Sequence, residues 1–211
     1  MTTVLIIDDH PAFRLVIKTH LLQLLGVSEI LEAENGQTAV EMARQNMPDL
    51  AILDLDIPRI NGLEVIPRLK LAHASMRVLI LSGQDPATFA PRAMRSGAQG
   101  FVGKSQDMKE IMRGVEAVMA GYTVFPINSG GAGMGAAGDL TEEEDKLKLL
   151  SDKELMILQM LSKGMSNKTI GDALFMSDKT VSTYKGRIQE KLGLGSLAAL
   201  IEFASLQKLI D

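Results

Sequence analysis

The first part of the chain alternates between short continuous apolar runs and longer stretches in which apolar positions recur at helical spacing. Continuous runs without in–out alternation are typical of parallel strands that are buried on both faces. They predict strands at 4–8, 29–33, 50–57, 78–82 and 101–104. The helical patterns predict helices from Phe13 to Leu24 and over 37–46, 62–72, 86–96 and 107–120. Five strand–helix units predict a doubly wound α/β domain with a parallel sheet.

After residue 146 the pattern changes to short helices and turns with no strand candidates. A serine stands where each of four helices is expected to begin, at Ser151, Ser166, Ser177 and Ser196. Ser151 with Glu154, like Asp107 with Glu110 in the first domain, forms a capping-box pattern. We expect the third helix over 178–192 and the fourth to end near residue 209. Two helices joined by a tight turn have the form of a helix-turn-helix, whose second helix enters the major groove of DNA.

The segment 128–145 separates these two patterns. It has five glycines, no apolar periodicity and a closing run of acidic residues. This composition is typical of a flexible linker, since structureless loops longer than about 12 to 15 residues are uncommon within compact domains. The alternative is a long surface loop inside one domain. We therefore expect a first domain over 1–126, a linker over 127–146 and an all-α second domain of four helices over 147–211.

Composition and charge narrow the classes of protein. Hydrophobic residues make up 46% of the chain and cysteine is absent, which excludes disulfides, thiolate zinc sites and cysteine nucleophiles and fits a reducing cytoplasm. Neither a signal-peptide pattern nor an apolar stretch of about 18 residues is present, so we expect a cytoplasmic protein with no membrane partner. Residues 146–211 carry 10 basic against 7 acidic side chains, which favours a polyanionic partner for this domain.

Polar residues stand at the carboxyl ends of four predicted strands, where functional groups gather in such sheets. They are Asp8 and Asp9 after the first strand, Asp54 and Asp56 at the third, Ser82 at the fourth and Lys104 at the fifth. Carboxylates packed together repel unless a positive group neutralises them, so the cluster predicts a Mg2+ ion with oxygen ligands. In such a site Asp54 can attack phosphorus as a nucleophile, with Lys104 paired to the phosphoryl group and Ser82 hydrogen-bonded to the product.

The segments IIDDH, LDLDIP, LILSGQ and GFVGKS carry these residues and resemble the four signature segments of response-regulator receiver domains. The resemblance spans residues 3–126. It implies that Asp54 accepts phosphate from a sensor histidine kinase, and that Asp8, Asp9 and a main-chain carbonyl at Asp56 serve Mg2+. By the same resemblance, the side chains of Ser82 and Lys104 contact the phosphoryl group. Gly83 matches a position kept small beside the phosphate, and Phe101 matches an aromatic whose rotamer is coupled to a shift of Ser82.

Residues 150–193 resemble the LuxR-type helix-turn-helix over its whole length, and a receiver followed by this module is identified as a member of the NarL/FixJ class of two-component transcription regulators. The TVSTYK and GYTVFP segments are similar to the BvgA and EvgA group, whose kinases are hybrid phosphorelay sensors. The resemblance implies a homodimer that binds promoter DNA and is not an enzyme, with RNA polymerase as a further candidate partner. It assigns backbone contacts to Asn167 and Lys168, and most other contacts to Lys179, Thr180, Ser182, Thr183, Lys185 and Arg187.

One departure from this class limits what can be carried over. Many relatives have lysines at the positions of Ser182 and Gly186, so their base preference cannot be copied to this chain.

The receiver is expected to control DNA binding through dimerisation. We expect phosphorylation at Asp54 to act through Ser82 and Phe101 on a receiver dimer face, which raises the effective concentration of two DNA-binding modules on paired half-sites. The last helix is a candidate dimer contact through part of its apolar stripe, Leu197, Leu200, Ile201 and Leu206.

Other interpretations stay open at this point. The DLDIP segment is also similar to the Asp-x-Asp pair of haloacid-dehalogenase-like hydrolases, although there the pair follows the first strand and not the third. Further alternatives are a ligand-sensing LuxR-type regulator, a receiver locked in one state, and a C-terminal helical dimerisation domain. His10 is a candidate phosphohistidine or ligand, but its place before Pro11 favours a helix start. Asp56 and Gln84 are candidates for tuning the lifetime of the phosphoryl group.

Overall fold

The computed structural model describes residues 2–58, 60–126, 146–207 and 209. Its chain divides into two compact units, Met1–Gly130 and Gly131–Asp211, and each is described by itself. The linker expected over 127–146 lies outside the described residues except for residue 146.

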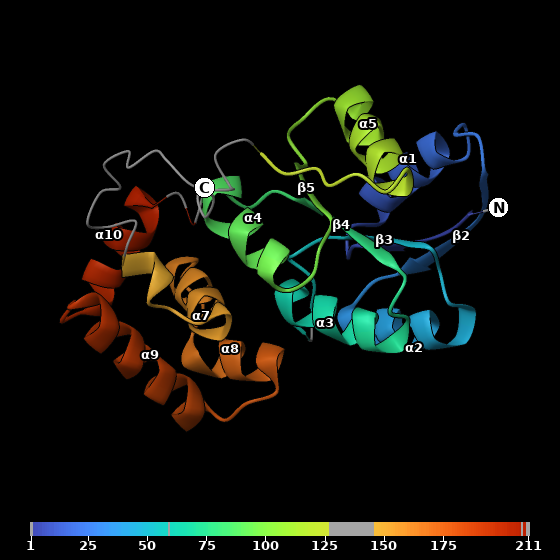
Figure 1. Ribbon diagram of the computed structural model, residues 1–211. Helices are drawn as coiled ribbons and strands as arrows, with labels where there is room; N and C mark the ends of the chain where they lie inside the picture. The colour runs from blue at the N-terminus through green and yellow to red at the C-terminus, as the bar shows by residue number, and fades with distance from the viewer. Residues whose placement is uncertain (1, 59, 127–145, 208, 210–211) are drawn as a thin grey trace. The chain divides into compact units, whose positions relative to one another are not determined.

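The first unit is built on a parallel sheet of five strands in the order β2-β1-β3-β4-β5. Its strands are β1 (Thr2–Ile7), β2 (Val27–Ala33), β3 (Leu50–Leu53), β4 (Arg77–Ser82) and β5 (Gly100–Gly103). The helices are α1 (Pro11–Leu21), α2 (Gly36–Asn46), α3 (Gly62–Ala72), α4 (Pro86–Arg95) and α5 (Met108–Met119). Helices α1 and α5 cover one face of the sheet, and α2 and α3 lie across the other (Figure 1). The predicted doubly wound α/β fold is confirmed.

Strands β1, β3 and β4 are buried along most of their length, which explains why their sequences lack in–out alternation, whereas the edge strand β2 is only partly buried. Val4 and Ile6 of β1 pack in one apolar cluster with Ile17 of α1 and Val115 of α5. Leu5 and Ile7 are also fully buried, and their side chains point to the opposite face because strand residues alternate. In β1, β3 and β4 the buried interior positions are apolar, so the polar side chains of these strands stand at or just beyond their ends.

Several element ends differ from those predicted. β3 ends at Leu53 and not at residue 57, because its pairing with β1 and β4 ends there and the Asp54 amide makes the last bond, to the Ile7 carbonyl, at 2.9 Å. α1 ends at Leu21, because after the Leu22 amide the next two, those of Gln23 and Leu24, donate to carbonyls three residues earlier and not four. Asp107 caps α5 as expected, but the Glu110 carboxylate pairs with Arg113, and no bond from it to the cap amide is seen among the described contacts.

The second unit has four helices between residues 152 and 206, as predicted. They are α7 (Asp152–Ser162), α8 (Asn167–Leu174), α9 (Asp178–Leu192) and α10 (Leu197–Leu206). Each expected serine cap is present, with its hydroxyl accepting a main-chain N–H three residues on, at Ser151, Ser166, Ser177 and Ser196. α9 has the predicted bounds, whereas α10 ends at Leu206, before the predicted end near residue 209. α8, a turn and α9 form the predicted helix-turn-helix.

Glu154 ties two of these helices together. Its carboxylate accepts the Ser151 amide and the Lys191 ammonium of α9, each at 2.7 Å, while Ser151 Oγ accepts the Glu154 amide. Burial acts to raise the pKa of Glu154, but the hydrogen bonds from Lys191 and Ser151 outweigh it and the pKa is lowered. Since the folded-state pKa is lowered, this pair stabilises the unit above the ordinary glutamate pKa and loses its effect as pH falls through the lowered value.

A close backbone approach sets the turn between α8 and α9. Phe175 ends α8 in the left-handed region at φ 54, and the Met176 amide donates to the Gly171 carbonyl at 2.8 Å. A β-carbon on Gly171 would lie 2.6 Å from the Met176 carbonyl oxygen, closer than real atoms approach. Glycine at this position therefore allows the second helix to leave at its observed angle.

Alanine at two helical glycines should have opposite effects on stability. Gly171→Ala should lower the melting temperature of the second unit, because the new methyl group meets the Met176 carbonyl. Gly186→Ala in α9 adds a methyl group where no neighbouring atom lies within 4 Å, and should stabilise the unit by up to about 1 kcal/mol. Thermal unfolding of the full chain by circular dichroism compares the two. Equal stabilisation by both substitutions would contradict the close approach at Gly171.

Candidate functional site

Two buried carboxylates face one ammonium at the carboxyl edge of the sheet. Asp8 follows β1 and Asp54 follows β3, and these strands are neighbours whose last residues, Ile7 and Leu53, are paired. Both aspartates are only 3% exposed. Lys104 follows β5, and its Nζ lies 2.6 Å from Asp8 Oδ2 and 2.7 Å from Asp54 Oδ2. The topology thus brings residues 8, 54 and 104 into one site.

At this site, burial disfavours the charged form of Asp54 more than Lys104 favours it. It raises the pKa of Asp54, although the hydrogen bond and charge of Lys104 act to lower it, and the nearby charge of Asp8 adds to the rise. Burial acts to lower the pKa of Lys104, but its bonds to Asp54 and Asp8 outweigh this and raise it. One ammonium therefore compensates two carboxylates incompletely, and a further positive charge would stabilise the ionised site.

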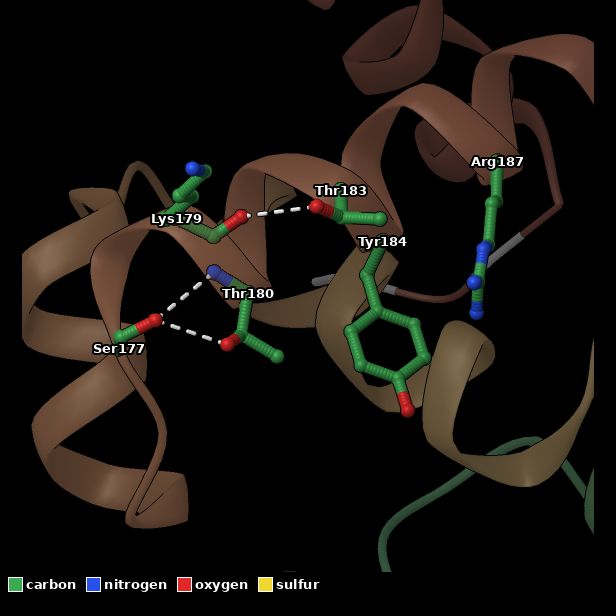
Figure 2. A pocket seen from close by; sticks show the side chains of 6 residues that line it. All are labelled: Ser177, Lys179, Thr180, Thr183, Tyr184 and Arg187. Atoms are coloured by element: carbon green, nitrogen blue, oxygen red, sulfur yellow. Dashed lines mark hydrogen bonds between the residues drawn. The ribbon is translucent and has the colours of Figure 1, made fainter.

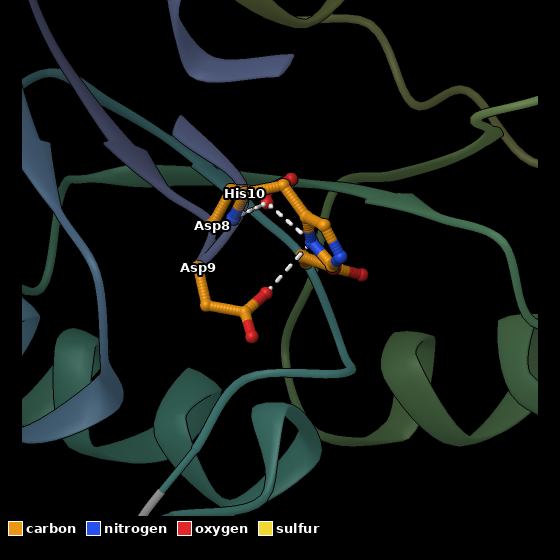
Figure 3. Close-up of side chains that lie close together, drawn as sticks. Asp8, Asp9 and His10 are labelled. Atoms are coloured by element: carbon orange, nitrogen blue, oxygen red, sulfur yellow. Dashed lines mark hydrogen bonds and ion pairs between the residues drawn. The ribbon is translucent and has the colours of Figure 1, made fainter. Parts of the chain in front are cut away.

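Four side chains beside Lys104 could hold a metal ion. One ligand atom each from Asp8, Asp9, His10 and Asp54 lies within 4.8 Å of the others. Figure 3 shows the first three at the end of β1, where His10 Nδ1 is 2.8 Å from Asp9 Oδ1 and 3.3 Å from Asp8 Oδ1. His10 precedes Pro11 at the start of α1 and makes no side-chain cap bond, so its expected place at a helix start is confirmed.

Asp56 and Gln84 are bonded to each other and to the residues that follow β3 and end β4. The Gln84 side-chain amide donates to Asp56 Oδ2 at 2.5 Å, and the main-chain amides of the two residues donate to the side chains of Ser82 and Asp54, each at 3.3 Å. Asp56 is exposed, and its carboxylate contacts Gln84. The pair thus borders the buried Asp54 on its solvent side.

The two residues expected to move together, Ser82 and Phe101, are both buried. Ser82 ends β4, and its carbonyl accepts the Lys104 amide at 2.9 Å. Phe101 is 2% exposed in β5, and its amide donates to the carbonyl of Val124 at 2.7 Å. A β-carbon on Gly83 would meet nothing within 4 Å, so its small size leaves open space beside the site.

One contact at the site was not predicted from the sequence. The Lys104 ammonium lies 4.6 Å from the centre of the Phe13 ring, within the range of a cation–π interaction. Phe13 was placed only in the apolar stripe of α1. The spacing of that stripe could have shown that Phe13 stands one turn from the helix start and hence near the strand ends.

In the second unit, the polar residues predicted to contact DNA lie mostly on exposed positions. Val181, Ile188 and Leu192 of α9 are buried, which leaves the opposite face in solvent. The exposed predicted residues are Lys168, Lys179, Thr180, Ser182, Thr183 and Arg187, while Asn167 and Lys185 are half-buried.

A shallow cavity of about 350 Å3 lies along α9. Figure 2 shows the side chains that line it, Ser177, Lys179, Thr180, Thr183, Tyr184 and Arg187. Tyr184 was not among the predicted contacts. Its spacing of three residues from Arg187 is the sequence signal that pairs them on one helix face.

Comparison with known families identifies both units. The model of the response regulator receiver domain matches residues 4–116, and that of the bacterial regulatory proteins of the luxR family matches residues 148–204. No described helix is long and apolar enough to cross a membrane.

Similar proteins are found along the whole chain. A putative transcriptional regulator of Pseudomonas aeruginosa is 47% identical over 100% of both chains. The virulence factors putative positive transcription regulator BvgA of Bordetella pertussis is 44% identical over 98% of each chain. Among solved structures, RcsB from Salmonella enterica serovar Typhimurium, bound to a promoter with a phosphomimetic, covers 97% of this chain and 98% of its own, with a TM-score of 0.68 and 21% identity. RcsB therefore shares the fold.

Neutralising Asp54 should stabilise the first unit in metal-free buffer. Its pKa is raised on folding, so the stability that this group contributes is present at low pH and is lost as pH rises through the folded-state pKa. Asp54→Asn should therefore melt at a higher temperature than wild type at neutral pH, and the difference should shrink as pH approaches the ordinary aspartate pKa of about 3.9. Thermal unfolding across this pH range measures it.

Asp172→Asn changes an exposed aspartate and is the control, with no expected shift in the first unit. A lower melting temperature for Asp54→Asn than for wild type at neutral pH would show that Lys104 compensates both carboxylates fully.

Proposed function

We propose that this chain, which belongs to the NarL/FixJ class of two-component response regulators, binds promoter DNA under the control of phosphorylation at Asp54. The class regulates transcription and is not a class of enzymes, so the hydrolase alternative no longer applies. One observation carries the proposal: a lysine ammonium bonds two buried aspartates at adjacent strand ends. We place the receiver at 1–126, the linker at 127–146 and the DNA-binding domain at 147–211.

Asp54 is the proposed phosphoacceptor. A sensor histidine kinase, of the hybrid phosphorelay type by resemblance, presents a phosphohistidine; its P–N bond breaks as a P–O bond forms to an Asp54 oxygen, and the imidazole nitrogen recovers the electron pair. Lys104 already lies 2.7 Å from that carboxylate and pairs with the phosphoryl oxygens. Ser82, one strand away, supplies a hydroxyl to hydrogen-bond the transferred group.

The donor set fits Mg2+, because the carboxylates offer the hard oxygen ligands that this ion prefers. Asp8 and Asp54 are buried and the Asp9 side chain is 37% exposed, so an ion held by these residues would be reached from the side of Asp9. The proposed ligands are these three side chains and the main-chain carbonyl of Asp56. Mg2+ supplies the positive charge that neutralises the phosphoryl oxygens during transfer.

Ser82 and Phe101 are the proposed switch that changes a receiver dimer face. In the DNA-binding domain, Leu200 of α10 is buried and belongs to the core, whereas Leu197 and Leu206 are 37% and 65% exposed. The exposed pair is the part of the predicted apolar stripe that is available for a dimer contact. A homodimer places two DNA-binding modules on paired half-sites and raises their effective concentration.

Promoter DNA is the proposed partner of the helix-turn-helix. Asn167 and Lys168 at the start of α8 contact the sugar–phosphate backbone, and the exposed side of α9 enters the major groove. The remaining proposed contacts are Lys179, Thr180, Ser182, Thr183, Lys185 and Arg187. The promoter-bound state of RcsB, which shares this fold, supports the assignment.

Phosphorylation should tighten DNA binding only when Asp54 is present. With sites selected from random DNA, acetyl phosphate and Mg2+ should increase the affinity of wild type by roughly 100-fold, the lower end of what linking two modules provides. Asp54→Asn should show no increase. Gel-shift titration at fixed salt measures all four combinations. Equal affinity in every combination would leave DNA binding intact but make the receiver a locked, passive domain.

Gln84 should lengthen the life of the phosphorylated state. Its bond to Asp56 lies beside Asp54 and limits the approach of water to the acyl phosphate. Gln84→Ala should speed autodephosphorylation several-fold, and Asp56→Asn, which keeps a hydrogen-bonding partner for Gln84, should have a smaller effect. Decay of 32P-labelled protein after removal of the donor gives the rates. An unchanged or slower decay in Gln84→Ala would contradict this shielding role.

A further inference from the structure

The hydroxyls on the exposed side of α9 are engaged by the helix itself. Thr180 Oγ1 lies 2.8 Å from Ser177 Oγ, which also accepts the Thr180 amide. Thr183 Oγ1 donates to the Lys179 carbonyl at 2.9 Å. Thr183 therefore cannot donate its hydroxyl proton to a base edge without giving up a local bond, and the Thr180 hydroxyl is shared with Ser177. The acceptor lone pairs of the Thr183 oxygen can still meet a base amino group, so this side chain reads fewer base-edge patterns.

Arg187, by contrast, contacts an aromatic ring. It is exposed, and its guanidinium carbon lies 5.7 Å from the centre of the Tyr184 ring one turn earlier. Tyr184 is half-buried, so its ring is a more restrained surface than an exposed side chain. Figure 2 shows the Arg187 side chain beside the Tyr184 ring. The contact restrains Arg187 before DNA binds.

The helix surface is open at the residue before Arg187. Gly186 has no neighbouring atom within 4 Å of where a β-carbon would stand. The planar fork of arginine matches the O6 and N7 acceptors of guanine in the major groove. Lys168 and Lys179, as point charges near the starts of α8 and α9, suit phosphates better.

We propose that Arg187, positioned by the ring of Tyr184, reads a guanine in each half-site and is the main determinant of base preference in this chain. The proposal rests on the DNA-binding function given above and adds a positioning residue, Tyr184. The ring, and not the phenol hydroxyl, is the part that matters, because the contact to Arg187 is made with the ring face.

The test uses the full-length phosphorylated protein and the site that wild type selects from random DNA. Binding is measured to that site and to its single-base variants at several salt concentrations. Wild type should lose roughly 5- to 150-fold when one particular guanine is replaced, the range for a bidentate contact. Arg187→Ala should lose discrimination at that base pair alone, and penalties elsewhere in the site should persist.

Tyr184 variants separate positioning from direct contact. Tyr184→Phe keeps the ring and should retain the guanine preference, whereas Tyr184→Leu should lose a large part of it. Lys163→Ala removes an exposed cation of the same domain outside α8 and α9 and should not alter base preference. Circular dichroism confirms that each variant melts as wild type does. Equal loss of preference in Tyr184→Phe and Tyr184→Leu would contradict the role of the ring.

Other results with Arg187→Ala or wild type would contradict the proposal. If Arg187→Ala weakens all sequences alike and lowers the salt slope by about 1, Arg187 contacts a phosphate and the proposal is wrong. An unchanged preference in Arg187→Ala also overturns it. If wild type itself selects no site, the DNA-binding function fails first, and that result is distinguishable because it appears before any variant is tested.

Discussion

The contact of one lysine with two buried aspartates is the interaction on which the receiver site depends. Asp8 and Asp54 are held less than 3 Å from the same ammonium, and both are removed from water. Like charges at such close range are tolerated only because Lys104 lies between them. The parallel sheet imposes this arrangement, since it ends β1, β3 and β5 at one edge and fixes their residues by main-chain hydrogen bonds.

The same edge connects the site to the rest of the receiver. The Lys104 amide donates to the Ser82 carbonyl, so the backbones of β4 and β5 are joined beside the proposed phosphoacceptor, Asp54. In the same strand, the Phe101 amide is bonded to Val124, close to the end of the receiver. Main-chain hydrogen bonds thus connect β4 through β5 to Val124, near the last described residues of the first unit.

Much of the fold could be predicted because burial leaves a clear apolar run in β1, β3 and β4, whereas the edge strand β2, with Ser28 and Glu29 exposed, gives a weaker signal. The carboxyl-end rule then placed Asp8, Asp54, Ser82 and Lys104 together. The predicted end of β3 was wrong because Leu55 and Ile57 are apolar and buried but lie outside the strand pairing. Hydropathy does not distinguish a buried loop residue from a buried strand residue. The contacts of Phe13 with Lys104 and Tyr184 with Arg187 were missed because spacing gives the face of a helix but not the direction of a side chain.

A comparison of the two buried carboxylate–lysine pairs separates a structural from a functional charge. Glu154 accepts bonds from both Lys191 and its own capping serine, and its pKa is lowered, so its charge is fully compensated. Asp54 shares its lysine with Asp8, and its pKa is raised. A carboxylate whose charged form is stabilised on folding requires no further cation. One whose charged form is destabilised on folding is stabilised by an added cation. The number of carboxylates that share one ammonium thus distinguishes the two sites: among the described contacts Lys191 bonds one carboxylate, whereas Lys104 bonds two, and the second arrangement fits the cation site proposed at Asp54.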